Sequence, residues 1–375
     1  MPDKNKTVVV AMSGGVDSSV AALLLKEKGY NCIGITMKLW DYDRVGGNLN
    51  HDSGCCSLDS INDARLVCAK IGIPHYVLNF SSDFHDGVVD DFITEYMSGR
   101  TPNPCIQCNI KIKWQTLIEK SKELGADFIA TGHYARVVYD KSNGRYALYR
   151  GNDENKDQSY ALWGIKQENL KRTLFPLGEL SKPEVRKIAE KHGLRTAHKS
   201  ESMEICFIPD NNYNRFLKQV VPGLDNKIAD GNLVNTRGEK LGKHSGYPFF
   251  TIGQRRGIGK GFGKPMYVIG TDPKKNFVII GEENELYAKE LIARKVNFVS
   301  IAGTNGGIRG RVKIRYRDKG SMATIHGLDE ERVRIVFDEP QKAITPGQSA
   351  VFYDDDRVLG GGIIDSFTKY TPKNK

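Results

Sequence analysis

Hydrophobic positions follow two alternating periods along about the first 135 residues. Short runs rich in β-branched residues predict strands, which we place at Thr7–Ala11, Cys32–Met37, His75–Phe80 and Phe128–Thr131. The stretches between them carry apolar residues on one helical face and predict helices that end at Gly29, Gly72 and Gly125. Because strands and helices alternate, we expect an α/β domain with a parallel sheet.

Two of these helices are expected at Asp59–Ile71 and Lys111–Leu124. A further helix is predicted by a capping box, in which Ser181 and Glu184 are three residues apart with Pro183 between them. We expect this helix to run to His192.

The pattern changes after about residue 210. Between Arg237 and Lys264 the chain has eight glycines, seven basic residues and one acidic residue, which excludes a helix. From Lys295 onward, short runs such as Val333–Phe337 and Ser349–Tyr353 predict a small β-barrel. We therefore expect three domains, namely a parallel-sheet domain at 1–212, a small, mainly-β, glycine-rich central domain at 213–286 and a β-barrel at 287–375.

The composition is that of a globular protein with no segment of about 20 apolar residues that would span a membrane. The first residues carry no apolar leader, and seven cysteines are an odd number in a long chain. We therefore expect a cytoplasmic protein without a disulfide framework and without a membrane partner.

The net charge of +10 lies entirely in the second half. Residues 1–212 hold 27 basic and 27 acidic residues, whereas residues 213–375 hold 28 basic and 18 acidic residues. This asymmetry favours a front half that does chemistry and a back half that binds a polyanion, although a basic solvated surface would look the same.

A glycine-rich turn joins the first strand to the first helix and reads Ser13-Gly14-Gly15-Val16-Asp17-Ser18. Glycines let backbone amides and the helix N-terminus converge on an anion. A carboxylate at Asp17 would repel phosphate unless a cation lay between them, which indicates Mg²⁺. The Walker loop is excluded because no Gly-Lys-Ser/Thr follows, and an ordinary strand–helix turn remains the alternative.

Cysteines mark a second candidate site. Cys105 and Cys108 form one CxxC pair. Such a pair can be half of a zinc site, a redox-active pair or two ligands of an iron–sulfur cluster, although no second CxxC exists to complete a zinc site. Cys206 lies in an apolar, strand-like stretch at 202–209 and would by itself be a buried hydrophobic residue, as would Cys32 and Cys68. Cys55 and Cys56 stay unassigned.

Basic residues in the second half follow a period of two, which predicts one cationic strand face: Arg309, Arg311, Lys313, Arg315, Arg317 and Lys319. Such a ladder repels itself unless a polyanion neutralises it, although a solvated face is the alternative. Arg255 and Arg256 follow three aromatic residues, Tyr247, Phe249 and Phe250, a mixture that suits RNA contact.

The hexapeptide at 13–18 resembles the SGGxDS motif of the ATP-pyrophosphatase superfamily. Together with TPNPCIQCN at 101–109, ATGHYAR at 130–136, DQSY at 157–160 and SMEICFI at 202–208, it makes the chain similar to the tRNA-specific 2-thiouridylase family from residue 7 to about residue 353. The resemblance implies an adenine-nucleotide α-hydrolase-like sheet domain. It also implies an ATP-dependent tRNA-uridine 2-sulfurtransferase acting on the wobble uridine of lysine, glutamate and glutamine tRNAs.

The chemistry agrees with this resemblance, because a pyrimidine oxygen must be activated before sulfur can replace it. Transfer of AMP to that oxygen, with release of pyrophosphate, makes it a leaving group, and a cysteine persulfide supplies the sulfur. The resemblance implies Cys206 as the persulfide carrier and Cys108 as the nucleophilic partner, joined transiently as a disulfide. A cysteine desulfurase or a sulfur-relay protein would deliver the sulfur.

The resemblance also assigns ligand contacts. It places ATP and Mg²⁺ at Ala11, Met12, Ser13, Gly14, Gly15, Val16, Asp17, Ser18, Met37 and Gly132. It places tRNA at Asn103, Pro104, Cys105, His133, Lys156, Asp157, Gln158, Arg315, Tyr316 and Gln348. The target base would be flipped out toward residues 103–105, because a stacked base cannot enter a catalytic site.

One position departs from many members of the family, which carry Asp where this chain has Cys105. With Cys108 and Cys206, this third thiol suggests ligands for a [4Fe–4S] cluster with one open iron, and the sequence leaves the cluster and the transient disulfide as alternatives. Three other functions were considered: an adenylating enzyme that uses ammonia, a thiolase for another tRNA position, and an RNA-binding protein with a structural zinc. Only the last is not an enzyme.

Overall fold

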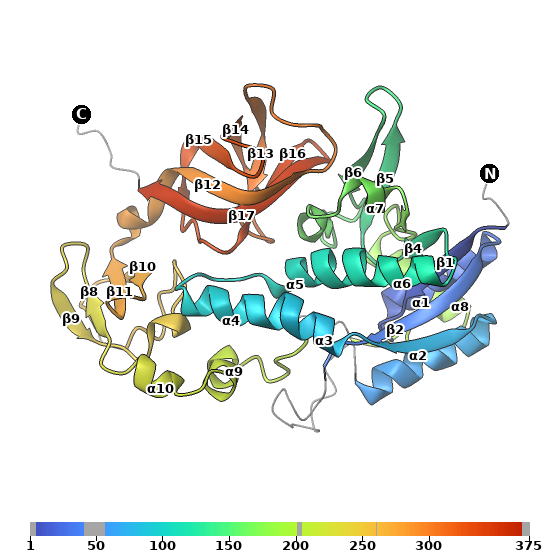
Figure 1. The fold of residues 1–375 in the computed structure, drawn as a ribbon, viewed down its shortest axis with the longest axis horizontal. Helices are drawn as coiled ribbons and strands as arrows, with labels where there is room; N and C mark the ends of the chain where they lie inside the picture. The colour runs from blue at the N-terminus through green and yellow to red at the C-terminus, as the bar shows by residue number, and fades with distance from the viewer. Residues whose placement is uncertain (1–4, 41–56, 201–204, 260, 370–375) are drawn as a thin grey trace.

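A parallel sheet of five strands forms the first part of the chain in the computed structural model, which describes residues 5–40, 57–200, 205–259 and 261–369 (Figure 1). Its strands are β1 (Thr7–Ala11), β2 (Asn31–Lys38), β3 (His75–Asn79), β4 (Phe128–Ala130) and β7 (Thr173–Leu174). They lie in the order β3-β2-β1-β4-β7, and all neighbouring pairs are parallel. The expected α/β domain is confirmed.

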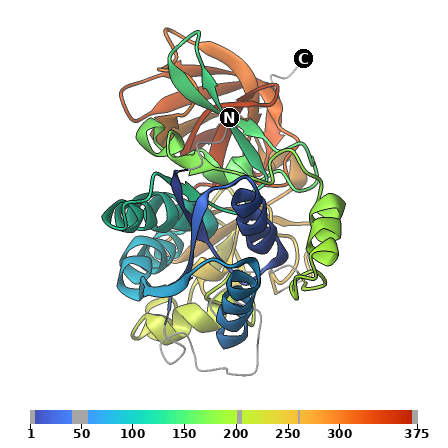
Figure 2. The same cartoon turned by 90° about the vertical axis from the view of Figure 1, so that its right-hand side faces the viewer.

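Helices cover both faces of this sheet (Figure 2). Val8 and Val10 of β1 face a core shared with α1 (Val16–Glu27), α2 (Leu58–Ile71) and α8 (Lys182–Lys191). Val9 and Ala11, which point the opposite way along the strand, face a second core that includes residues of α6 (Leu117–Glu123). The sheet is therefore the middle of three layers, with its apolar strands buried on both sides.

The capping box predicted at Ser181 is present, because the backbone N–H of Ser181 donates to Glu184 Oε2 at 2.8 Å and α8 follows. The helix predicted at Lys111–Leu124 begins earlier than expected. Asn103 is the N-cap of α5 (Pro104–Gln107), and the chain continues through a π-helix (Cys108–Thr116) into α6. Proline suits the first helical position because the missing N–H would have no partner there. The CxxC pair therefore lies on the helix and not in the loop before it.

A four-stranded sheet forms the middle part of the chain, in the order β10-β11-β8-β9. Its strands are β8 (Asn232–Val234), β9 (Lys240–Lys243), β10 (Tyr267–Asp272) and β11 (Phe277–Gly281). The last part is a barrel, as predicted, because β12 and β17 pair with each other and close a ring of six strands. These strands are β12 (Tyr287–Phe298), β13 (Ile308–Lys313), β14 (Ser321–Gly327), β15 (Val333–Lys342), β16 (Ser349–Asp354) and β17 (Arg357–Lys369).

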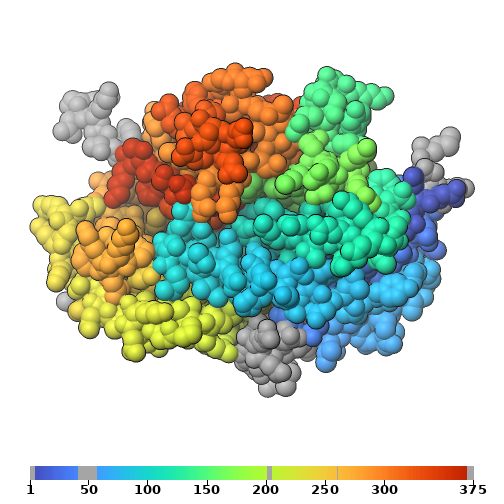
Figure 3. All heavy atoms as spheres, viewed as in Figure 1, coloured from blue at the N-terminus to red at the C-terminus, as the bar shows by residue number. Residues whose placement is uncertain are grey.

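A hairpin from the first part of the chain extends this barrel sheet. Strands β5 (Ala135–Asp140) and β6 (Arg145–Arg150) pair with each other, and β6 pairs with β17 through Tyr149 opposite Arg357 and Leu148 opposite Val358. Figures 1 and 3 show the barrel lying directly on the helices of residues 81–123. The sheet domain and the barrel are thus joined by shared strands as well as by surface contact.

Short elements complete the described residues: α3 (Ser81–Phe84), a π-helix (His85–Val89), α4 (Asp90–Met97), a 3-10 helix (Ser159–Leu162), α7 (Gln167–Leu170), α9 (Tyr213–Val220), α10 (Leu224–Lys227) and 3-10 helices at Tyr247–Phe249 and Glu283–Leu286. None of the described helices has the length and apolar character that crossing a membrane requires.

Candidate active site

The carboxyl edge of the parallel sheet brings three predicted ATP-binding segments together. Neighbouring strands β2, β1 and β4 lead at this edge into Met37, residues 12–15 and Gly132, respectively. Chain order along the sheet reverses between β1 and β4, and ligands of open α/β sheets bind in the crevice at such a point. The segments also touch, because a Cβ added to Gly132 would lie 2.7 Å from the backbone of Asp17 and Ser18.

The glycine-rich turn has a fixed backbone. Gly14 has a φ of +70°, and a Cβ there would lie 2.1 Å from the carbonyl oxygen of Ser60, so only glycine fits. The backbone N–H of Ser13 donates to Ser18 Oγ at 3.2 Å, and Ser19 Oγ donates to the carbonyl of Gly15 at 2.8 Å. Gly15 is the N-cap of α1 and brings no side chain to the amides of the first helical turn. These amides and the helix dipole form a site suited to phosphate.

Asp17 is held by a lysine, Lys182, that no sequence motif singles out. Lys182 Nζ donates to both carboxylate oxygens of Asp17 at 2.8 Å, and the Tyr134 hydroxyl donates to one of them at 2.8 Å. Lys182 is buried at 7% exposure in the first turn of α8. The one sequence signal near Lys182 is the capping box. Lys182 directly follows Ser181 of that motif, which fixes where α8 begins. Asp17 retains 31% side-chain exposure and has the carboxylate oxygens that Mg²⁺ prefers.

The CxxC helix presents its two cysteines differently. Cys105 is exposed, whereas Cys108 is 9% exposed and belongs to the hydrophobic core on one face of the sheet. Residues three apart are neighbours on a helix surface, so Cys105 lies next to Cys108 at the edge of this core. Cys206, about a hundred residues later, is partly buried and packs against the same core. The structure thus brings the two predicted catalytic cysteines to one hydrophobic cluster.

The strand expected around Cys206 is absent over its described part. Residues 205–209 form turns, in which the N–H of Ile208 donates to the carbonyl of Ile205 at 2.9 Å. The N–H of Asn211 then donates to the carbonyl of Ile208, and Asn211 has a φ of +54°. Successive turns satisfy the backbone locally, so no neighbouring strand is needed. Residues 201–204 of this motif lie outside the described residues.

Within the described ranges, one group of side chains has the spacing that a metal ion needs. His85, Asp86 and Asp90 are exposed and have ligand atoms within 4.8 Å of one another. Cys105, Cys108 and Cys206 do not form such a group, which argues against a single zinc ion held by these three thiols. A four-iron cluster separates its cysteine ligands more widely than one ion does, so this finding concerns a single ion only.

Cys32 and Cys68 are buried as predicted, at 1% and 0% exposure. Burial raises the pKa of Cys32 to about 11 and that of Cys68 to about 12. Both thiols are therefore protonated at neutral pH and unsuited to nucleophilic attack. Cys55 and Cys56 lie outside the described residues.

The motif at 156–158 lies beside the barrel. The Tyr316 hydroxyl donates to the backbone carbonyl of Asp157 at 3.1 Å, which brings two predicted tRNA-binding segments together. The Asp157 side chain is itself buried at 8% exposure, where it accepts from the N–H of Ser159 at 3.0 Å and pairs with Arg150 at 3.3 Å. Its carboxylate has a structural role and does not face solvent. Gln158 Oε1 accepts from the N–H of Tyr134 at 3.0 Å.

His133 also has local partners. Its Nδ1 lies 2.6 Å from Thr131 Oγ1, and its ring packs 5.7 Å from that of Trp114. Desolvation, and to a lesser extent the charge of Lys113, lower the pKa of His133 well below its usual value. His133 is therefore neutral at physiological pH, and any contact with RNA would use a neutral imidazole.

The loop before the CxxC helix is bound by the barrel. Gln348 Nε2 donates to the carbonyls of Thr101 and Pro102 at 2.9 and 3.1 Å. Gln348 thus lies beside the predicted base-contacting residues Asn103 and Pro104, and part of its hydrogen-bonding capacity holds this loop.

The prediction of one cationic strand face at 309–319 is wrong. Strand β13 ends at Lys313, and residues 314–317 form a bend and a turn in which the N–H of Ile314 donates to Asp318 Oδ2 at 3.0 Å. Lys313 is buried at 7% exposure, and desolvation lowers its pKa. Arg309 pairs with Asp338 at 2.7 Å, whereas Arg315 and Tyr316 are exposed in the turn. A period of two cannot reveal where a strand ends.

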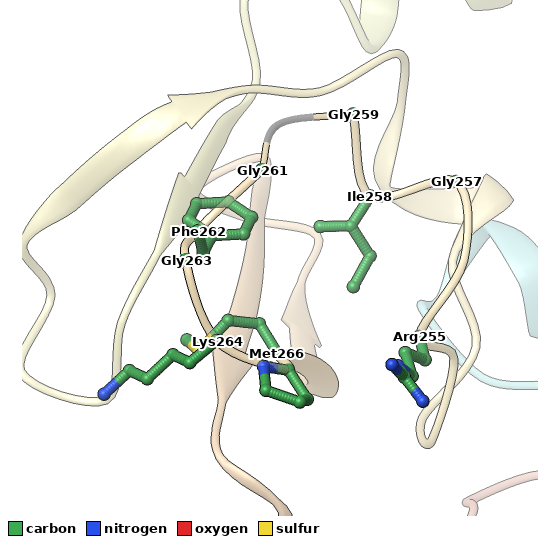
Figure 4. A pocket seen from close by; sticks show the side chains of 10 residues that line it. Arg255, Gly257, Ile258, Gly259, Gly261, Phe262, Gly263, Lys264 and Met266 are labelled. Atoms are coloured by element: carbon green, nitrogen blue, oxygen red, sulfur yellow. The ribbon is translucent and has the colours of Figure 1, made fainter.

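The aromatic residues expected to stack on RNA are instead buried. Tyr247, Phe249 and Phe250 have exposures of 6%, 7% and 6% and belong to the hydrophobic core. The basic loop that follows them lines an open cavity of about 580 Å³, with Arg255 and Ile258 on one side and Phe262 and Lys264 on the other (Figure 4). None of its lining residues belongs to the glycine-rich turn or to the cysteine motifs.

Comparison with known proteins places this geometry in a family. Three sequence profiles match: "tRNA methyl transferase HUP domain" over residues 6–210, "tRNA methyl transferase PRC-barrel domain" over 214–282 and "Aminomethyltransferase beta-barrel domain" over 288–364. A protein of Salinibacter ruber named "tRNA-specific 2-thiouridylase MnmA" is 50% identical over 362 residues, covering 96% of this chain and 94% of its own. A protein of Clostridioides difficile with the same name is 50% identical over 361 residues, covering 96% of this chain and 98% of its own.

The profile descriptions name methyl transfer, whereas the relatives are named for thiolation. Identity of 50% over 96% of the chain is the more specific finding, because it covers every motif described above, and it confirms the resemblance stated from the sequence. The chain belongs to the tRNA-specific 2-thiouridylase family.

Proposed function

We propose that this protein is an ATP-dependent tRNA-uridine 2-sulfurtransferase that forms 2-thiouridine at the wobble position. The observation that carries this proposal is that Cys108 and Cys206 both pack in the hydrophobic core on one face of the sheet whose carboxyl edge holds the glycine-rich turn. An adenylating enzyme that uses ammonia needs the turn but gives no role to these two thiols.

ATP activates the base in the first step. The 2-oxygen of the uracil attacks the α-phosphorus, the bond from that phosphorus to the bridging oxygen breaks, and pyrophosphate leaves. The amides of the turn at 13–18 and the N-terminus of α1 bind the phosphates, with the flanking residues Ala11, Met12, Met37 and Gly132 around the nucleotide. Asp17 would hold Mg²⁺, which supplies charge neutralisation for the phosphates, and Lys182 holds the Asp17 carboxylate in place.

Sulfur transfer forms the product in the second step. The terminal sulfur of a persulfide on Cys206 attacks C2 of the base, and AMP leaves with the former 2-oxygen. The Cys108 thiolate then attacks the Cys206 sulfur, which breaks the sulfur–sulfur bond, releases the thiolated base and leaves a Cys108–Cys206 disulfide. A thiol reductant must supply two electrons before the next cycle.

An iron–sulfur centre is a second route to the same product. Cys105, Cys108 and Cys206 would hold a [4Fe–4S] cluster, which when bound would offer an open iron for sulfide. Three cysteine thiols are the kind of ligand that such a cluster takes, and Cys105 and Cys108 are neighbours on the helix. Iron and acid-labile sulfide in anaerobically purified protein would distinguish this route from the disulfide.

The substrate and the sulfur source follow from the same proposal. Lysine, glutamate and glutamine tRNAs would bind across the basic second half and the sheet domain, with Lys156, Gln158, Arg315 and Tyr316 near the anticodon arm and residues 103–105 at the flipped base. A cysteine desulfurase or relay protein in the cytoplasm would load Cys206. We assign the catalytic domain to 1–212, and tRNA contact to the domains at 213–286 and 287–375.

An anaerobic reaction tests the proposal. Unmodified glutamate tRNA, Mg²⁺-ATP and a persulfide donor are incubated with the protein, nucleotides are separated by chromatography, and thiolated tRNA is detected by retardation on a mercury-containing gel. We expect pyrophosphate, AMP and retarded tRNA from the wild type and from Cys68→Ala, which alters a buried cysteine outside the site. Pyrophosphate without retarded tRNA would support adenylation but contradict the proposed substrate. The absence of all products, even after iron reconstitution, would refute the proposal.

A further inference from the structure

Residues 97–102 connect α4 to the CxxC helix. The middle domain and the barrel both form hydrogen bonds to this connection. Proline at positions 102 and 104 stiffens the end of this connection. A displacement at Thr101 is therefore carried to the beginning of α5, and so to Cys105 and Cys108. The position of the two thiols depends on what holds this connection.

The middle domain holds its first half. The Tyr247 hydroxyl donates to the carbonyl of Met97 at 2.8 Å, and Thr271 Oγ1 donates to the carbonyl of Gly99 at 2.9 Å. Gly99 has a φ of +70°, and a Cβ there would lie 2.4 Å from Thr271 Oγ1 and 2.9 Å from Pro273. Only glycine permits this close approach.

The barrel holds the second half in a similar way. The N–H of Thr101 donates to the carbonyl of Pro346 at 2.9 Å, and Gln348 binds the carbonyls of Thr101 and Pro102 as described above. Gly347 has a φ of +94°, and its Cβ would lie 2.7 Å from the carbonyl oxygen of Thr101. Both contacts thus rely on a glycine with positive φ.

A closed ring of four charged residues fixes the connection to two barrel strands. Arg100 Nε donates to Glu95 at 2.7 Å, and its Nη1 donates to Asp365 of β17 at 3.1 Å. Arg294 of β12 donates to the other Glu95 oxygen at 2.9 Å and pairs with Asp365 at 3.1 Å. Glu95 and Arg100 have side-chain exposures of 13% and 17%, so removal of one charge leaves its partners poorly compensated.

We propose that residues 97–102 are the junction through which the middle domain and the barrel set the position of the CxxC helix, with Arg100 as a positioning residue for Cys108. Sulfur transfer needs two thiols and a base carbon in near-attack geometry, and a displacement of about 1 Å can lower a rate by about 100-fold. Adenylation needs the glycine-rich turn and the base at residues 103–105, whereas sulfur transfer needs the base and the position of Cys108 as well. Loosening the junction therefore lowers thiolation more than pyrophosphate release.

The experiment compares two perturbations with a matched control. Arg100→Gln opens the ring, and the double variant Tyr247→Phe/Thr271→Val removes two hydrogen bonds without changing side-chain shape. Lys120→Gln is the control, because Lys120 forms an exposed ion pair with Glu123 on α6. Three rates are measured: the first-turnover release of pyrophosphate, the formation of thiolated tRNA, and the alkylation of Cys108 by iodoacetamide, mapped by mass spectrometry.

We expect Arg100→Gln to lower thiolation at least tenfold, to lower pyrophosphate release by no more than about threefold and to accelerate Cys108 alkylation at least fivefold. The double variant should shift thiolation and alkylation in the same directions by about threefold, and it carries the test if Arg100→Gln does not fold. Equal losses of pyrophosphate release and thiolation, or thiolation and alkylation at wild-type rates, would overturn the proposal. Thiolation as a readout presupposes the proposed function, but Cys108 alkylation does not, so a wild type that thiolates no tRNA would refute the proposed function alone.

Discussion

The glycine-rich turn and the CxxC helix are held in place in different ways. In the turn, residues 13–19 bond partly to one another, and their distant hydrogen-bond partners Tyr134, Lys182 and Thr196 belong to the same sheet domain. The connection at 97–102, which leads into the CxxC helix, is instead bonded by the middle domain and by the barrel, 150–250 residues later in the chain. The phosphate-binding turn is thus held within one domain, whereas the CxxC helix also depends on the other two.

The largest expected difference between thiolation and pyrophosphate release comes from substitution of the catalytic cysteines. Cys108→Ala and Cys206→Ala should each lower formation of thiolated tRNA by at least about 1,000-fold, because no thiol remains to carry or release the sulfur. First-turnover release of pyrophosphate should stay within a factor of two of wild type. A proportional loss of pyrophosphate release would show that the two regions are not separable.

Lys182→Gln perturbs the turn instead. The variant leaves Asp17 with the Tyr134 hydroxyl but without its ammonium partner, and breaking a buried ion pair costs about 3 kcal/mol or more, less here because Asp17 is partly exposed. We expect pyrophosphate release to fall by about 100-fold, while the rate of Cys108 alkylation is unchanged. Lys187→Gln, an exposed lysine on the same helix, is the matched control.

Gly347→Ala should act on the other region with a smaller effect. The added Cβ would lie 2.7 Å from the carbonyl oxygen of Thr101, and the left-handed backbone conformation is strained for alanine. We expect about tenfold slower thiolation and a smaller loss of pyrophosphate release in single-turnover assays. Gly238→Ala supplies the control, because Gly238 also has positive φ but has open space around its Cβ position.

The smallest expected effect is on the pH dependence of stability. Burial lowers the pKa of His75, His133 and His244 in the folded protein. Below about pH 6.5 the unfolded chain binds protons at these positions that the folded chain does not bind, so the free energy of unfolding falls as the pH decreases. The loss is at most about 1.4 kcal/mol per pH unit for each histidine.

Thermal unfolding between pH 7.5 and 5.5 measures this loss, and His75→Gln should reduce its slope. His75 and His133 belong to the sheet domain, and His244 belongs to the middle domain. The change of slope in His244→Gln, set against that in His75→Gln, therefore compares the pH dependence of the two domains. A melting temperature that rises toward pH 5.5 would contradict the expectation.

The parts of the fold that were predictable from sequence are those with local causes. The four strands at 7–11, 31–38, 75–79 and 128–130, the capping box at Ser181 and the turn at 13–18 depend on neighbouring residues, and all were placed correctly. The helix expected to begin at Lys111 begins at Pro104 instead, because proline suits the first helical position and Asn103 caps it.

The remaining errors have distant causes. The cationic ladder ends at Lys313 because Asp318 folds the chain back, and the aromatic group at 247–250 is buried by residues remote in sequence. The Lys182–Asp17 pair joins residues 165 positions apart, and the ring around Arg100 joins residues up to 265 positions apart. A pattern of neighbouring residues holds no information about such pairs, because they exist only after the chain has folded.

The hairpin β5–β6 has a consequence for how the molecule is made. Its last residue, Arg150, leaves the ribosome about 200 residues before β17 begins at Arg357, which is roughly 10–40 s at 5–20 residues per second. During this interval β6 has an unpaired edge, of the kind that recruits other strands. The edge of β6 is therefore paired only after β17, the last strand, has been synthesised. A truncated product that lacks β17 would keep this edge exposed and prone to aggregation.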